Sequence, residues 1–283
     1  MRIAALTSLA MLAFAANSVL ARLALAAAGD EAIAYTGGRL ASGAIALTVL
    51  LLAFNHRGVQ SFRIAGSWTG AAALAGYALA FSIAYIMLGA GTGALILFAS
   101  VQIGVVGAAI VKGDRPGLLQ WIGLAVAFSG LVYLVSPGLV APHPLGALLM
   151  LVAGLCWAAY TLAGRGSLSP LADTTGNFIR CLPLAIPLVL IGALWHGMSS
   201  TTLLYAIASG VVASGFGYAV WYAVLPSLTR TRAAIVQLTV PAIAAAGGIV
   251  FLAEPLSLRL VVASLAILGG VALALLAASK RAG

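Results

Sequence analysis

The chain has 283 residues, of which 63% are hydrophobic and 7% are charged, and its mean hydropathy is +1.17. So few charges could not cover the surface of a water-soluble domain of this size, so the composition predicts a polytopic membrane protein. The net charge of +9 does not indicate nucleic-acid binding, because the basic residues are not clustered.

A membrane-spanning helix needs about 20 mostly apolar residues, and ten such segments follow one another along the chain. The first resembles a signal peptide, since it follows Arg2 and ends in an alanine-rich run, but its length and its polar residues favour a span. The expected spans are residues 3–27, 33–53, 67–88, 91–111, 118–135, 144–164, 174–195, 203–225, 232–252 and 258–278.

The ten spans divide into two sets of five, residues 1–138 and 139–283. Because five is odd, the second set must start from the opposite side of the bilayer, which is the signature of an inverted-repeat transporter. Matching residues recur at a nearly constant offset, in the pairs Arg22 and Arg165, Asp30 and Asp173, and Arg39 and Arg180. We therefore expect an all-α fold of two inverted five-helix repeats, with a substrate path between them.

Most of the 14 Lys and Arg residues fall in connections on one side of the predicted bundle. Basic connections stay in the cytoplasm, so both termini are expected to be cytoplasmic. Cys156 and Cys181 lie within predicted spans, which favours packing over a disulfide, and neither a metal site nor a cofactor is expected. Every Asp, Glu and His lies at or near a span end or in a loop, whereas proton-coupled pumps commonly use an intramembrane acid or histidine. A facilitator or exchanger is favoured.

Two motifs in the second half point to a family. The sixth span carries Trp157 and Tyr160 in a WxxY pattern, and the ninth runs from Pro241 to Glu254-Pro255-Leu256. Together with the ten-span layout, they resemble the EamA-type branch of the drug/metabolite transporter superfamily. The first half departs from the pattern, since Phe14 stands where a tryptophan is common and residues 112–116 replace the Glu-Pro-Leu ending.

Within this family the chain is most similar to the YddG-like amino-acid exporters. That likeness implies export of aromatic and other neutral amino acids across a bacterial inner membrane, through a central cavity walled mainly by spans one, three, four, six, eight and nine. The alternative substrate is another small metabolite, such as a nucleobase, a sugar or a drug-like compound. The expected partners are the substrate and the lipid bilayer, with no nucleic acid, and the chain is expected to be a monomer or a weak homodimer. An intramembrane enzyme is disfavoured, because Ser214 has no suitably placed histidine or acid.

A zwitterionic substrate needs hydrogen-bonding groups and apolar or aromatic walls near mid-membrane. Polar side chains deep in spans avoid lipid, so they are expected to point inward. The competing interpretations are interhelical hydrogen bonds for the amides and helix packing or an interfacial belt for the aromatics; the belt is favoured for Tyr85 and Tyr222. The candidate substrate-binding residues are Asn17, Tyr77, Phe81, Phe98, Gln102, Trp157, Tyr160, Trp221 and Gln237.

Arginines inside spans need a partner or water, because a central arginine costs about 2.5–3.5 kcal/mol on insertion scales. Arg39 and Arg180 could receive a substrate carboxylate, or could lean towards the acids at their own span ends. The expected gating or structural ion-pair groups are Arg22, Asp30 and Arg39 near one mouth and Arg165, Asp173 and Arg180 near the other. Pro183, Pro187 and Pro241 are candidate hinges, because an interior proline removes a helix hydrogen bond.

Overall fold

A computed structural model of the chain describes residues 2–26, 28–55, 65–111, 113, 116–137, 141–164, 167–195, 197–228, 233 and 236–282. Within these ranges the regular elements are all helices. The first half holds α1 (Arg2–Leu25), η1 (Gly29–Glu31), α2 (Ala32–Asn55), α3 (Trp68–Met87), α4 (Ala90–Val111) and α5 (Leu118–Val135).

The second half contains shorter helices. In chain order they are α6 (Pro144–Ala163), α7 (Pro170–Arg180), α8 (Leu182–Trp195), α9 (Ser200–Ala208), the π-helix η2 (Ser209–Phe216), α10 (Gly217–Val224), η3 (Leu225–Ser227), α12 (Thr239–Leu252) and α13 (Leu258–Ala282).

The helices confirm a polytopic membrane protein. In the described part of the chain, eight helical stretches are long and apolar enough to cross a bilayer, and the bent pair α7 and α8 would make a ninth. The remaining apolar helix, α12, has 14 residues, which is short of a full span. The count of ten spans therefore stays a prediction.

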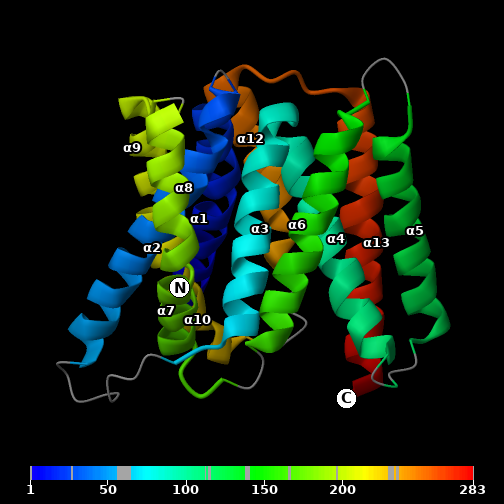
Figure 1. Ribbon diagram of the computed structural model, residues 1–283. Coiled ribbons are helices and arrows are strands. Elements are labelled where there is room, and N and C mark those ends of the chain that lie inside the picture. The colour runs from blue at the N-terminus through cyan, green and yellow to red at the C-terminus, as the bar shows by residue number, and fades with distance from the viewer. Residues whose placement is uncertain are drawn as a thin grey trace.

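The helices stand side by side, with their connections at two opposite faces (Figure 1). We call upper the face where α3 gives way to α4 and where α12 ends, and lower the face where α3 and α7 begin. The pairs in closest association are α5 with α13 at one edge, α6 with α3 and with α4, and α2 with α8.

The packing of α5 on α13 depends on glycine. A Cβ atom on Gly270 would lie 2.5 Å from the carbonyl oxygen of Gly123, and a Cβ on Gly123 would lie equally close to that of Gly270. The backbones therefore touch without intervening side chains, as small residues permit in membrane helices. The neighbouring Gly269 has no atom within 4 Å of its Cβ position, so it faces away from this contact.

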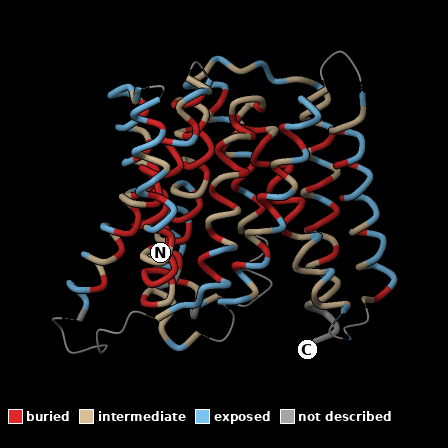
Figure 2. The backbone as a smooth tube through the Cα atoms, in the orientation of Figure 1, coloured by how far each residue is buried: buried red, intermediate tan, exposed pale blue. Residues whose placement is uncertain are grey.

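Buried residues concentrate at the centre of the bundle, while the outer helix faces are exposed (Figure 2). The exposed faces are rich in large apolar side chains; on α5 they include Trp121, Ile122, Phe128 and Val132. An apolar outer surface of this extent is what lipid tails would cover.

The expected seventh span is broken. The axes of α7 and α8 differ by 46° across Cys181. Pro183, the second residue of α8, has no N–H to donate to the preceding turn, which explains a break at this place, and Pro187 removes a second bond inside α8. Pro241 differs from the expectation, because it lies in the first turn of α12, where proline is tolerated, and not in the middle of a long helix.

Candidate functional site

A narrow pocket lies in the centre of the bundle. Its walls come from α1, α3, α4, α6, η2 and α10 and from Gln237 ahead of α12, the same six spans that the family resemblance implies. The lining residues are Phe14, Asn17, Ser18, Tyr77, Phe81, Leu97, Phe98, Trp157, Ala213, Tyr218 and Gln237.

Aromatic rings form the larger part of the pocket wall. In this wall the ring of Trp157 lies 4.8 Å from Tyr77 and is stacked 5.5 Å from Tyr218. Its ring also lies 5.3 Å from Tyr160, which is outside the wall. Phe14 meets Tyr218 at 5.7 Å from the other side. Such a wall offers flat apolar surfaces, suited to a substrate with an aromatic or apolar side chain.

A chain of polar side chains links four helices beside these rings. Asn17 of α1 donates from Nδ2 to the hydroxyl oxygen of Tyr77 on α3 at 3.2 Å and accepts at Oδ1 from the Ser209 hydroxyl of η2. Arg39 of α2 donates from Nη2 to the same Tyr77 oxygen at 3.1 Å. The amide of Asn17 therefore makes the interhelical hydrogen bonds considered above and lines the pocket as well.

The π-helix η2 places two members of this site. Its wider turns run from Ser209 to Phe216 in the middle of the eighth span and bring Ser209 to Asn17 and Ala213 to the pocket. π-Helical turns are rare and occur mostly at functional sites. Gly210 lets η2 pack closely on α2, since a Cβ at this position would lie 2.4 Å from the carbonyl oxygen of Arg39.

Three of the nine candidate substrate-binding residues lie outside the pocket wall. Tyr160 donates from its hydroxyl to Thr174 of α7 at 3.4 Å, and Trp221 lies behind Phe14 at 5.9 Å between ring centres. Gln102 is half-buried on α4 and does not line the pocket. Five residues outside these nine candidates also line the pocket: Phe14, Ser18, Leu97, Ala213 and Tyr218.

Tyr85 was wrongly favoured as an interfacial belt residue. Its side chain is fully buried, its ring packs 4.7 Å from Phe81, and its hydroxyl donates to the carbonyl oxygen of Ala90 at 3.4 Å. Its place near a span end misled the sequence argument, because α4 begins beside it and covers it. The side chain of Tyr222 lies outside the described residues.

The upper face is tied across the two halves by charged groups. Arg22 at the end of α1 forms an ion pair with Glu254 after α12, with 3.3 Å between Nε and Oε1, and donates to the carbonyl oxygens of Tyr85 and Ile86. The Glu254 carboxylate also accepts from the backbone N–H of Ala90 at 2.8 Å, at the start of α4. Such a position suits an anion, because the N-terminus of a helix is electropositive.

The lower face is tied through α7 and the segment before α3. Asp173 accepts from the backbone N–H of Gly66 at 2.9 Å, and Asn177 accepts from that of Ser67 at 2.8 Å. Arg180 donates to the backbone oxygens of Ala65 and Gly176. Thus Asp173 and Arg180 both lie at this face, but each bonds to backbone and not to the other.

The upper charged group differs from the expected one. Arg22 pairs with Glu254, while Asp30 is exposed and makes no ion pair with a described residue. Glu31 accepts from the backbone N–H and the hydroxyl of Ser199, both at 3.0 Å. Arg39 reaches neither acid, because its guanidinium contacts Tyr77 and Phe81. Arg165 lies outside the described residues.

Comparison with known proteins places the chain in a family. The sequence pattern of the EamA-like transporter family matches residues 144–276. Over 273 residues, 95% of this chain and 93% of the other, the chain is 50% identical to an uncharacterized protein of Pseudomonas aeruginosa. The chain belongs to the EamA-like transporter family. Family members are transporters, so the EamA-like assignment also decides against an intramembrane enzyme.

More distant relatives of this EamA-like chain are exporters or transporters by name. The chain is 31% identical over 163 residues to the threonine/homoserine exporter RhtA of Salmonella typhimurium, which is 54% of this chain and 53% of that protein. It is 25% identical over 199 residues to an uncharacterized transporter of Archaeoglobus fulgidus. A crystal structure with 20% identity shares the fold, with a TM-score of 0.62 over 94% of this chain and 97% of the other.

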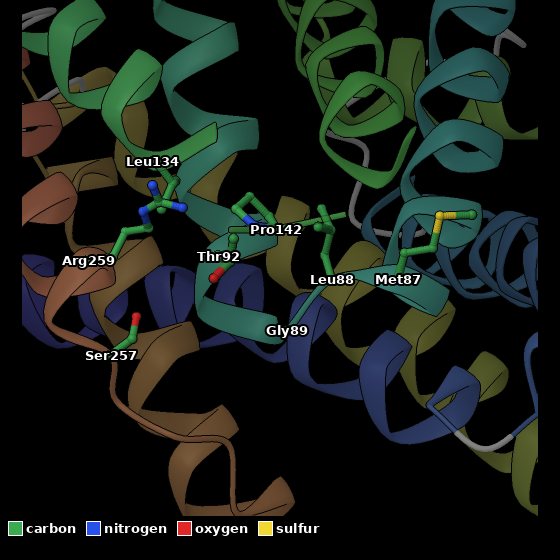
Figure 3. A pocket seen from close by; sticks show the side chains of 8 residues that line it. All are labelled: Met87, Leu88, Gly89, Thr92, Leu134, Pro142, Ser257 and Arg259. Atoms are coloured by element: carbon green, nitrogen blue, oxygen red, sulfur yellow. The ribbon is translucent and has the colours of Figure 1, made fainter. Parts of the chain in front are cut away.

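The EamA-like fold also contains a second pocket near the upper face, and none of the proposed site residues lines it (Figure 3). It lies between the start of α4 and the end of α5, and Arg259 of α13 lines it together with Thr92 and Ser257. Arg259 also donates to the carbonyl oxygen of Pro137 at 3.4 Å and lies over the ring of Tyr133. The residue is half-buried, and its Nη1 atom has no hydrogen-bond partner among the described residues.

Proposed function

We propose that this EamA-like transporter exports aromatic and other neutral amino acids across the bacterial inner membrane. The observation that carries the proposal is the central pocket, which joins a wall of aromatic rings to the side-chain amides of Asn17 and Gln237. The rings suit an apolar or aromatic side chain, and the amides can bond to the polar groups of a zwitterion.

The exporter works by alternating access between two inverted repeats, residues 1–138 and 139–283. The packing supports this mechanism: α6 packs on α3 and α4, and α1 packs in a corresponding manner on α10 and α12. Each face is held by hydrogen bonds between the halves, through Glu254 above and Asn177 below. Breaking one set while the other holds would expose the pocket to one side at a time.

The lower face is the cytoplasmic face, with both termini inside. The positive-inside rule supports this orientation, since the basic connections after α2, α4 and α6 all lead from the lower ends of their helices (Figure 1). The C-terminal end of α13 lies on the same side (Figure 1). Substrate therefore enters from below and leaves at the face held by Glu254.

The relative RhtA and the pocket wall of this chain favour substrates of different size. RhtA is named for threonine and homoserine, which are small and hydroxylated, and it matches about half of this chain. The wall here presents Phe14, Tyr77, Phe81, Trp157 and Tyr218, which favours larger, flatter side chains. Small hydroxylated amino acids are therefore the second candidate class, and one assay can rank the two.

The test is efflux from proteoliposomes that contain the purified full chain and either labelled phenylalanine or labelled threonine. Phenylalanine is expected to leave faster, and Tyr77→Ala and Trp157→Ala to slow it at least about tenfold. Trp121→Ala is the matched control, because that tryptophan is half exposed on the outer face of α5. Faster threonine efflux would favour the RhtA-like substrates, and efflux of neither would overturn the amino-acid assignment.

A further inference from the structure

Arg39 differs from the other buried or half-buried arginines that the structure describes, because no carboxylate or carbonyl oxygen accepts from it. Arg22 has Glu254, Arg180 has two backbone oxygens, and Arg259 has one. Arg39 is only 1% exposed, and its Nε and Nη1 atoms have no hydrogen-bond partner within the described ranges. A buried, unpaired charge costs several kcal/mol, so this guanidinium needs an anion.

The charge of Arg39 stands directly behind one wall of the central pocket. Its Cζ atom lies 4.9 Å from the ring centre of Phe81 and 5.1 Å from that of Tyr77, and both rings line the pocket. The lining includes no Asp, Glu or His. A positive charge with no acid nearby, in surroundings of low dielectric, attracts anions and repels cations.

The Tyr77 hydroxyl connects this charge to the pocket. Its oxygen accepts from both Arg39 and Asn17, and the described residues provide no acceptor for its own proton. A hydroxyl that accepts from a cation becomes a stronger donor, because the two bonds polarise each other. The free proton of Tyr77 is therefore well placed to donate to a carboxylate oxygen in the pocket.

We propose that the pocket recognises its substrate by the carboxylate, which the Tyr77 hydroxyl binds in the field of Arg39, and that it does not require the α-amino group. This inference rests on the proposed function and extends it, because aromatic monocarboxylates without an amino group become ligands. The corresponding amines, which lack the carboxylate, are excluded. An ammonium group finds no acid in the lining and meets the repulsion of Arg39.

The test uses the purified full chain and three matched compounds: phenylalanine, 3-phenylpropionate without the amino group, and phenethylamine without the carboxylate. Binding is followed by titration calorimetry. We expect 3-phenylpropionate to bind within about tenfold of phenylalanine, and phenethylamine at least about a hundredfold more weakly. Arg39→Gln should weaken both carboxylates at least about tenfold while leaving binding of the uncharged 3-phenylpropionamide within about twofold.

Two further variants keep the test decisive. Tyr77→Phe retains the ring and removes only the hydroxyl, so it should weaken 3-phenylpropionate about tenfold even if Arg39→Gln does not fold. Arg259→Gln removes a half-buried arginine of α13 that lines the other pocket and donates to the carbonyl oxygen of Pro137, and it should leave the preference for the acid over the amide unchanged. If phenethylamine bound as tightly as phenylalanine, or if Tyr77→Phe bound both acids normally, this inference would be overturned and the proposed function would stand. If none of the three compounds bound, both this inference and the proposed aromatic amino-acid function would be overturned.

Discussion

Arg22 of α1 and Glu254 after α12 form the one ion pair within 4.0 Å in the described part of the chain, and they join the two halves at the upper face. The Glu254 carboxylate lies in a space that only glycine leaves open: a Cβ on Gly248 would be 2.5 Å from its Oε2, and a Cβ on Gly89 would be 2.8 Å away. One carboxylate thus holds the ends of α1 and α12 and the start of α4 together.

Replacing Glu254 by Gln should loosen the upper face. The amide oxygen can still accept from Ala90, but Arg22 loses its counter-charge in a partly buried setting, which costs about 1–3 kcal/mol. We expect faster reaction of a cysteine at Ser18, a pocket residue, with an impermeant maleimide added outside, after Cys156 and Cys181 have been replaced. Unchanged labelling would show that the ion pair does not close this face.

Replacing Asn177 by Leu should loosen the lower face instead. The side-chain oxygen of Asn177 accepts from the backbone N–H of Ser67 just before α3, and Leu would leave that N–H without its acceptor. The same Ser18 cysteine should then react faster from the cytoplasmic side, in inside-out vesicles, and no faster from outside. Each variant serves as the control for the other, and equal effects on both sides would indicate general loss of structure.

Substitutions at two adjacent glycines of α13 should have different effects on stability. Gly270→Ala places a methyl group 2.5 Å from the backbone oxygen of Gly123 and 2.6 Å from the nitrogen of Ala127, so α5 and α13 must separate. We expect a loss of about 1–3 kcal/mol, seen as a lower melting temperature in detergent. Gly269→Ala meets no atom within 4 Å and should be neutral or stabilising by up to about 1 kcal/mol. Equal melting temperatures would contradict the packing described.

Helical periodicity was enough to predict much of the pocket. Tyr77 and Phe81 are four residues apart on one predicted face, and the structure places both at the pocket. Asn17, Phe98, Trp157 and Gln237 line it as well, because deep polar or aromatic side chains in an apolar helix favour the bundle interior. Six of the nine proposed substrate-binding residues therefore meet in one place; their role in binding remains a prediction.

Pairings between helices could not be predicted from periodicity. Glu254 is far from Arg22 in sequence, so the expected charged group at this mouth comprised Arg22, Asp30 and Arg39 and left Glu254 out. The π-helix was also missed, since the run from Ser209 to Phe216 differs little in composition from an α-helix. Its wider turns form where Gly210 allows close contact with α2, which is a tertiary effect.

Replacing Asn17 by Ala should impair both stability and transport. Asn17 joins Tyr77 of α3 to Ser209 of η2, and its removal leaves the buried Ser209 hydroxyl without this acceptor. We expect a loss of about 1–3 kcal/mol in unfolding free energy and slower phenylalanine efflux. Thr7→Ala is the control, because that hydroxyl on the same helix donates to the backbone oxygen of Ile3, one turn away. Normal efflux by Asn17→Ala would exclude the residue from the transport path.

The level to which substrate accumulates should not depend on a pH gradient. Coupling to protons commonly needs a group in the membrane that binds and releases them, such as Asp, Glu or His, and the pocket lining includes none of these. Proteoliposomes loaded with labelled phenylalanine should therefore reach the same final distribution with and without an imposed gradient. A steep dependence of that distribution on the gradient would mean that a proton-binding group elsewhere in the chain takes part in transport.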